Sequence, residues 1–163
     1  MYLNYKQYDA RFILEGAFQL VIKKGFSSVT ARGIAKELSI STQPVYIQFE
    51  NMNELKVELK KYIFKYIKYT YFSEIAENKN SFFSKYYDFT INDKKLFVSI
   101  NTDRELVKDF NDFLYKMFCE IPEIKKISNI QKKQLIYARY TGVVTSLIYI
   151  NSEVTYQELI ACV

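Results

Sequence analysis

The stretch Thr30–Phe49, TARGIAKELSISTQPVYIQF, decides the fold that we expect for this chain of 163 residues. Thr30 is a favourable N-cap, because its hydroxyl oxygen can accept a hydrogen bond from the first turn of a helix. The segment ARGIAKEL that follows has apolar residues at helical spacing. Its apolar side carries Ile34, Ala35 and Leu38. We therefore predict a short amphipathic helix directly after Thr30.

A second short helix is predicted over about Thr42–Phe49. The apolar periodicity breaks before it, and Ser41 or Thr42 can cap it. Pro44 falls in its first turn, where the missing N–H of proline costs nothing. Two short helices joined by a tight turn around one buried apolar residue, Ile40, indicate a helix-turn-helix, whose second helix enters the DNA major groove. For this stretch alone, an ordinary pair of packed helices is the alternative interpretation.

The flanking segments RFILEGAFQLVIKKGFSSVT and ENMNELKVELKKYI extend the pattern, and residues 11–59 resemble the TetR family of bacterial transcriptional regulators. The motifs that carry the resemblance are Lys24-Gly25-Phe26, Thr30-x-Arg32-x-Ile34-Ala35, Ile40-Ser41-Thr42, Val45-Tyr46, Phe49 and Asn53-Glu54-Leu55. A match at this many fixed spacings favours the helix-turn-helix over a chance pair of helices.

The resemblance implies an all-α protein with two domains. A three-helix, helix-turn-helix DNA-binding domain would occupy residues 1–54, and a helical effector-binding and dimerisation domain residues 55–163, entered through a connecting helix. It also implies a homodimer on palindromic double-stranded DNA, acting as a repressor rather than an activator and responding to a small-molecule effector. The alternative is a helical protein-interaction module that retains the helix-turn-helix but binds DNA weakly or without specificity.

The resemblance assigns contacts with DNA phosphates to Thr30, Arg32 and Tyr46, and Lys56 is a further candidate. Thr30 and Arg32 open the first helix of the motif, where backbone amides and side chains meet phosphates. Tyr46 corresponds to a tyrosine of the family whose hydroxyl reaches a phosphate. Met52 stands where the family usually has a lysine, and Lys56, one turn later, is the candidate to replace it.

Contacts with base edges are assigned to the start of the second helix. Gln43 can form a bidentate pair with adenine, while Thr42 and Pro44 offer apolar contact to a thymine methyl group. Gln48 stands where the family usually has a histidine or a tyrosine. Val45 and Phe49 are expected to face inward.

Two further departures from the family pattern lie next to these residues. Ser39 replaces the usual turn glycine, and Gly33 stands inside the first helix of the motif. A glycine in a helix interior costs about 0.5–1 kcal/mol relative to alanine. We expect both departures to affect DNA affinity more than the fold.

The composition agrees with a helical protein. Only 4 Gly and 2 Pro are present, and 49% hydrophobic with 25% charged residues is ordinary for a globular chain. A formal net charge of +5 permits binding to nucleic acid without requiring it. The sequence is rich in aromatics, with 15 Tyr and 13 Phe.

Catalysis is not expected. The chain has no histidine and no glycine-rich phosphate loop, and Cys119 and Cys162 form no C-x-x-C pair. We therefore predict no enzyme activity, no cofactor and no metal site. The most apolar window, Gly142–Ile150, is too short to span a bilayer, and the amino-terminal residues lack a signal-peptide pattern, so we expect a cytoplasmic protein without a membrane partner.

The rest of the chain is predicted as a series of helices. They cover about Asp9–Lys24, from Asn51 or Asn53 to about Ala76, Ser84–Ile91, a stretch after Asp103, and Ile130–Tyr149. Thr155 to Glu158 form a capping box for a short last helix. Small residues at Thr141, Gly142, Thr145 and Ser146 allow close approach of another helix, and the resemblance implies that residues 130–163 form the dimer interface.

Aromatic residues in the second half of the chain allow two interpretations. They either line an effector cavity or form a fully packed core. The effector-site candidates are Phe82, Phe83, Tyr86, Tyr87, Phe97, Phe110 and Phe113. An aromatic cavity would suit a planar or apolar molecule, or a cation if Asp88, Asp109 or Asp112 pointed into it.

Overall fold

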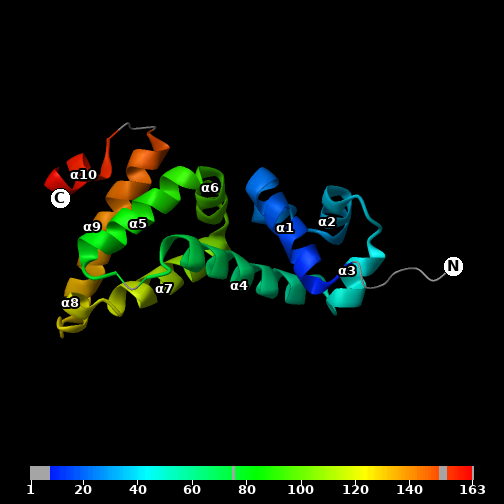
Figure 1. Cartoon of the computed structure of the whole chain (residues 1–163), viewed down its shortest axis with the longest axis horizontal. Coiled ribbons are helices and arrows are strands. Elements are labelled where there is room, and N and C mark those ends of the chain that lie inside the picture. The colour runs from blue at the N-terminus through cyan, green and yellow to red at the C-terminus, as the bar shows by residue number, and fades with distance from the viewer. Residues whose placement is uncertain (1–7, 75, 151–153, 163) are drawn as a thin grey trace. The chain divides into compact units, whose positions relative to one another are not determined.

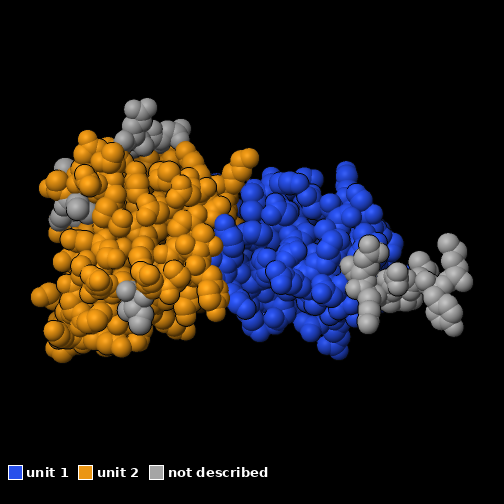
Figure 2. All heavy atoms as spheres, in the orientation of Figure 1, with its two compact units in different colours: residues 1–66, 98–107 blue, residues 67–97, 108–163 orange. Residues whose placement is uncertain are grey.

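The computed structural model describes residues 8–74, 76–150 and 154–162. Every regular element in that part of the chain is a helix, which confirms the all-α prediction (Figure 1). The chain divides into two compact units (Figure 2). Unit 1 contains residues 1–66 and 98–107, and unit 2 contains residues 67–97 and 108–163. The expected division into a DNA-binding domain of residues 1–54 and an effector-binding and dimerisation domain of residues 55–163 stays a prediction, because it assigns a function to each part.

Unit 1 is built on the helix α1 (Ala10–Lys24), which contacts both helices of the predicted motif. The Asp9 side chain accepts a hydrogen bond from the Phe12 amide at 2.8 Å and so caps the helix. α1 ends at Gly25, whose φ of 85° is readily adopted only by glycine. The short 3-10 turn η2 (Phe26–Ser28) follows and buries Phe26.

The predicted helix-turn-helix is present as α2 (Ala31–Leu38) and α3 (Gln43–Gln48). Thr42 occupies the N-cap position of α3, but its side chain makes no capping hydrogen bond. Pro44 lies in the first turn, as predicted. Ile40, predicted to be buried, is half-buried.

Helix α4 (Met52–Tyr71) begins in unit 1 and ends in unit 2. The Asn51 side chain caps it by accepting hydrogen bonds from the Asn53 and Glu54 amides at 2.9 and 3.0 Å. Leu55, Leu59, Ile63 and Ile67 are each fully buried, because residues four positions apart lie on one side of a helix. The helix ends five residues before Ala76, where the chain turns and buries Phe72 against Phe82 at 5.1 Å between ring centroids.

Unit 2 completes the helix series. It holds α5 (Lys79–Asn92), part of α6 (Lys94–Thr102), most of α7 (Arg104–Cys119), α8 (Pro122–Lys125), α9 (Ile130–Tyr149) and α10 (Tyr156–Cys162). α9 has the predicted bounds, and the Thr155–Glu158 capping box forms as predicted. α5 begins earlier than predicted, because Asn78 accepts a hydrogen bond from the Ser81 amide and caps it.

Aromatic rings fill the interior of unit 2. Phe83 has no exposed surface and stacks on Tyr140 with ring centroids 4.4 Å apart. Phe89 contacts the rings of Phe97 and Phe110 at 5.9 and 5.7 Å. Such edge and offset contacts are the preferred arrangement of aromatic pairs. These rings pack α5 against its neighbours in the unit.

One side of α9 is buried against α5 and the other is exposed. The buried side carries Tyr137, Tyr140, Thr141, Val144 and Ile148. On the other side, Leu135 is 71% exposed and Tyr149 is 53% exposed, with the exposed Gly142 and Ser146 between them. Over the described residues, no helix is both long and apolar enough to cross a membrane.

Candidate DNA-binding surface

The start of α2 is fixed by its cap and by close packing. The Thr30 hydroxyl oxygen accepts a hydrogen bond from the Gly33 amide at 3.0 Å, as the sequence predicts for an N-cap. A Cβ added at Gly33 would lie 3.0 Å from the Leu20 side chain, the Ser28 carbonyl and the Thr30 hydroxyl. The glycine therefore lets α2 approach α1 closely, which offsets its low helix propensity.

The turn between α2 and α3 has a left-handed residue. Ser39 has φ 55° and ψ 41°, in the position where the resembling family usually has glycine. Its amide donates to the carbonyls of Ala35 and Lys36, and the Ile40 amide donates to Ala35 at 2.9 Å. These bonds cover the free carbonyls at the end of α2. The turn thus has the geometry that a glycine would give, with some strain.

Helix α3 separates a buried side from an exposed side. Val45 and Phe49 are 0% and 5% exposed, so both pack inward as expected. Gln43 is exposed, and Thr42, Pro44 and Gln48 are half-buried. On the exposed side, Tyr46 shows 57% and Ile47 52% of its surface. Ile47 was not among the sequence-based candidates, since an apolar residue in an amphipathic helix is usually assigned to the core.

Arg32 is exposed on α2, two residues after the cap. Lys56 is half-buried on α4, with its ammonium nitrogen 6.0 Å from the centroid of the Phe26 ring. Lys60, one turn later, approaches the same ring at 5.9 Å and lies 3.6 Å from the Glu105 carboxylate. Both lysines therefore pack over η2 and carry positive charge beside it.

Every sequence-based DNA-binding candidate lies in unit 1. Thr30 and Thr42 are the N-cap residues of α2 and α3, and the others lie on α2, α3 and the start of α4. α2 and α3 contact one another, and α1 contacts both. Together they offer a basic side chain, a capped helix start, and a short helix with exposed amide, phenol and aliphatic side chains. Such groups can contact phosphates and base edges.

The effector candidates of unit 2 are arranged as a packed cluster. Phe82, Phe83, Tyr86, Phe97 and Phe110 are each no more than 4% exposed, while Tyr87 and Phe113 are half-buried. The Tyr86 hydroxyl is 3.4 Å from the Thr145 hydroxyl, and burial raises the pKa of Tyr86 to about 12. One cavity of unit 1 is described below, and none of these aromatics lines it. An effector site among these residues stays a prediction.

Metal ligands are not clustered. Among the described residues, no three His, Cys, Asp or Glu side chains are grouped so that they could hold an ion.

Comparisons with known proteins agree with this architecture. Residues 13–59 match the model of "Bacterial regulatory proteins, tetR family". The chain is similar to a transcriptional regulator (TerR/AcrR family) from Aquifex aeolicus VF5, with 16% identity, a TM-score of 0.63 and 91% of each chain covered.

Two further solved structures have the same fold. Apo AibR shares 16% identity and has a TM-score of 0.58 over 92% of each chain. The transcriptional regulator FadR from Bacillus subtilis, in complex with stearoyl-CoA, shares 17% identity and has a TM-score of 0.53 over 88% of this chain and 89% of that one. At these identities the likeness shows the fold alone. No curated protein matches the chain.

Proposed function

Because the chain belongs, through residues 13–59, to the tetR family of bacterial regulatory proteins, we propose that it is a homodimeric repressor that binds a palindromic DNA operator. The observation that carries the proposal is the exposed side of α3, with Gln43, Tyr46 and Ile47 open on a helix of the helix-turn-helix. In that motif the second helix reads base edges in the major groove.

Each candidate has a distinct role in the proposed complex. Arg32, Tyr46 and Lys56 contact phosphates and set the position of the protein, without reading sequence. Gln43 reads an adenine, and Ile47 adds apolar contact to a thymine methyl group beside Thr42 and Pro44. Gln48 and the cap residue Thr30 complete the surface at the ends of the two helices.

The proposed dimer forms along the exposed side of α9. Leu135, Gly142 and Tyr149 lie on one helix side at spacings of seven, so the same strip of each copy can meet its twofold mate. The small residue in the middle allows two backbones to approach, while the large ones add apolar area. α10 would extend the interface. Each protomer of the dimer then presents its α3 to one half-site of the operator.

The proposed effector acts through unit 2. The FadR structure of the same fold holds stearoyl-CoA, which supports an apolar ligand among the aromatic residues of this unit. α4, α6 and α7 each contribute residues to both units, so they are the segments through which a ligand would alter unit 1. The ligand releases DNA only if it binds the DNA-incompetent arrangement more tightly, by about 1–3 kcal/mol.

The decisive experiment is fluorescence anisotropy of the full chain with duplex DNA that flanks its own gene, repeated at several salt concentrations. Arg32→Ala should weaken binding to all sequences and lower the salt dependence by about 2 in log–log slope, since the dimer loses two charges. Lys125→Ala is the charge-matched control, because Lys125 lies in unit 2 and pairs with Glu120.

Sequence reading is tested separately with Gln43→Ala. This variant should lose about 1–3 kcal/mol of discrimination at one base pair of the operator. It should discriminate at the other base pairs as the unsubstituted protein does. Binding that ignores salt, or no duplex binding at any salt, would contradict the proposal and favour a helical protein-interaction module. That the protein has no catalytic activity stays a prediction.

A further inference from the structure

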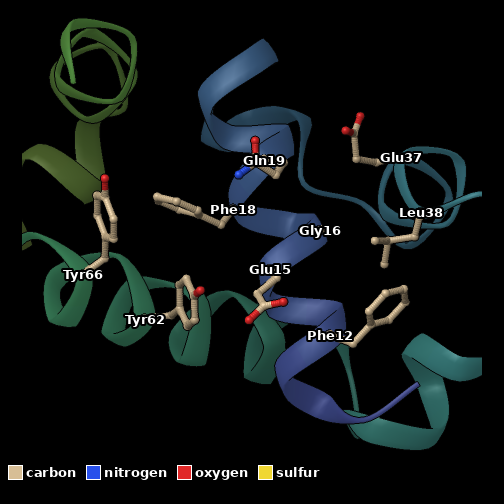
Figure 3. A pocket seen from close by; sticks show the side chains of 9 residues that line it. All are labelled: Phe12, Glu15, Gly16, Phe18, Gln19, Glu37, Leu38, Tyr62 and Tyr66. Carbon is tan, nitrogen blue, oxygen red and sulfur yellow. The ribbon is translucent and has the colours of Figure 1, made fainter. Parts of the chain in front are cut away.

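Residues of unit 1 line an open pocket of about 430 Å³, and none of the effector candidates of unit 2 is among them. Residues of α1, α2 and α4 line it, and Gly16 of α1 is one of them (Figure 3). Figure 3 shows Phe18, Tyr62 and Tyr66 on one side of Gly16, and Phe12 beside Leu38 on the other. The volume is in the range of small-molecule sites in proteins.

The lining of this cavity is acidic and aromatic. Glu15 and Glu37 line it, and none of the nine described lining residues is basic, in a chain whose formal net charge is +5. The Phe18 ring lies 5.5 Å from that of Tyr62 and 5.1 Å from that of Tyr66. Ring faces attract cations through their quadrupole, and carboxylates attract them by charge.

The partners of the two carboxylates leave room for a ligand. Glu15 pairs with Arg11 at 2.9 Å, and Glu37 pairs with Lys23, but Arg11 is 81% and Lys23 is 56% exposed. The Arg11–Glu15 pair is exposed and contributes little, whereas the Glu37 side chain is only 20% exposed. A carboxylate can accept several donors at once, so each can still accept a further donor. Burial, and after it the negative charge of Glu15, raise the pKa of Tyr62, while the positive charge of Arg11 lowers it, so both charges act on that ring.

From these observations we propose that the cavity between α1, α2 and α4 binds a small organic cation that carries an aromatic or alkyl group. The ammonium lies beside Glu15, whose charge acts on Tyr62, and the apolar part lies against Phe18, Tyr62 and Tyr66. Glu37 adds negative charge at the other side of the pocket. The site goes beyond the proposed function: it shares no lining residue with the DNA-contacting candidates or with the aromatic cluster of unit 2, and its occupancy requires no DNA.

The test is a titration of the full chain, without DNA, with benzyltrimethylammonium, followed by ¹H–¹⁵N NMR and calorimetry. We expect saturable binding with a dissociation constant on the order of 1 mM, as for other ligands of this size. The shifted amides should lie in residues 12–19, 37–38 and 62–66. Phenylacetate, which has the same ring and the opposite charge, should bind at least about tenfold more weakly.

Two sets of variants locate the site. Glu15→Gln with Glu37→Gln should weaken binding of benzyltrimethylammonium about tenfold, while the charge-matched control Glu58→Gln with Glu120→Gln leaves it unchanged. Tyr62→Leu should weaken it about fivefold and Tyr62→Phe should restore it, because phenylalanine keeps the ring. The tyrosine pair decides the matter if the double glutamine variant fails to fold.

Three results would overturn the proposal. They are the absence of saturable binding, equal binding of phenylacetate, and an unchanged affinity in both the glutamine and the leucine variants. Each of them can be observed whether or not the protein binds DNA, so a failure of this site is distinguishable from a failure of the proposed DNA-binding function.

Discussion

Replacing Gly142 with leucine should stabilise each protomer and weaken the dimer. Within the described part of the chain, a Cβ added at Gly142 meets no heavy atom within 4 Å, so the protomer has room for the new side chain. Leucine has a higher helix propensity than glycine, which should raise the free energy of unfolding of the protomer by about 0.5–1 kcal/mol.

The dimer should respond in the opposite direction. If Gly142 lies where two copies of α9 meet, both copies bring a leucine into one interface, and overpacking of this kind costs about 1–3 kcal/mol. This corresponds to a dissociation constant about 5- to 150-fold larger. Sedimentation velocity over a range of concentrations measures that constant. Thermal unfolding at concentrations below it measures the protomer alone, because dimerisation otherwise adds to the apparent stability.

Gly16→Ala is the matched control. A Cβ at Gly16 would lie 2.5 Å from Cγ of Leu38, so this substitution should destabilise the protomer and leave the affinity between protomers unchanged. If Gly142→Leu leaves the dissociation constant unchanged, α9 does not form the interface at this position. If Gly142→Leu lowers the free energy of unfolding of the protomer, the inference that the protomer has room for a side chain at Gly142 is wrong.

Three further outcomes follow from single residues. Ser39→Gly should raise the free energy of unfolding by about 1 kcal/mol in urea titrations, because glycine adopts φ 55° without the strain of a side chain. Phe83→Ala should lower it by about 3–5 kcal/mol, since the ring is fully buried against Tyr140; a much smaller loss would indicate an open cavity there. Burial in the folded state raises the pKa of Tyr86 to about 12, above the unfolded value of 10. The stability that the protonated Tyr86 hydroxyl contributes is therefore complete below pH 10 and is lost as the pH rises from 10 to 12. Urea titrations at pH 9, 10 and 11 should show that fall, and Tyr86→Phe should make it shallower.

The helix-turn-helix could be predicted from the sequence because its signals are local. Thr30 and Asn51 cap the helices that follow them, and Pro44 lies where proline is tolerated. Such caps act within three or four residues, so they are visible in one sequence. The same argument explains α9, whose start at Asn129 and predicted bounds depend on a cap and a long apolar period.

Elements that depend on tertiary contacts were not predicted. The sequence predicts no helix over α6, because its segment KKLFVSINT follows the turn residues Asn92-Asp93 and ends in the further turn residues Asn101-Thr102. It also contains three β-branched residues, which lower helix propensity. Burial decides its structure: Leu96, Phe97 and Ile100 are at most 1% exposed. The cavity of unit 1 was not predicted either, since Glu15 and Tyr62 are 47 positions apart in the sequence and meet only through packing.

The aromatic content of the chain illustrates why composition alone cannot locate a ligand. The sequence allows the phenylalanines of residues 82–113 to be either a cavity lining or a core, and the rings around Phe83 and Phe89 contact one another as core residues do. The sequence does not identify Phe18, Tyr62 and Tyr66 as a ligand site, because their spacing is typical of the apolar sides of two helices. What distinguishes them is the combination of ring faces, two carboxylates and open volume at one place. A ligand site requires that combination, because apolar side chains that already pack against one another expose no further surface that a ligand could bury.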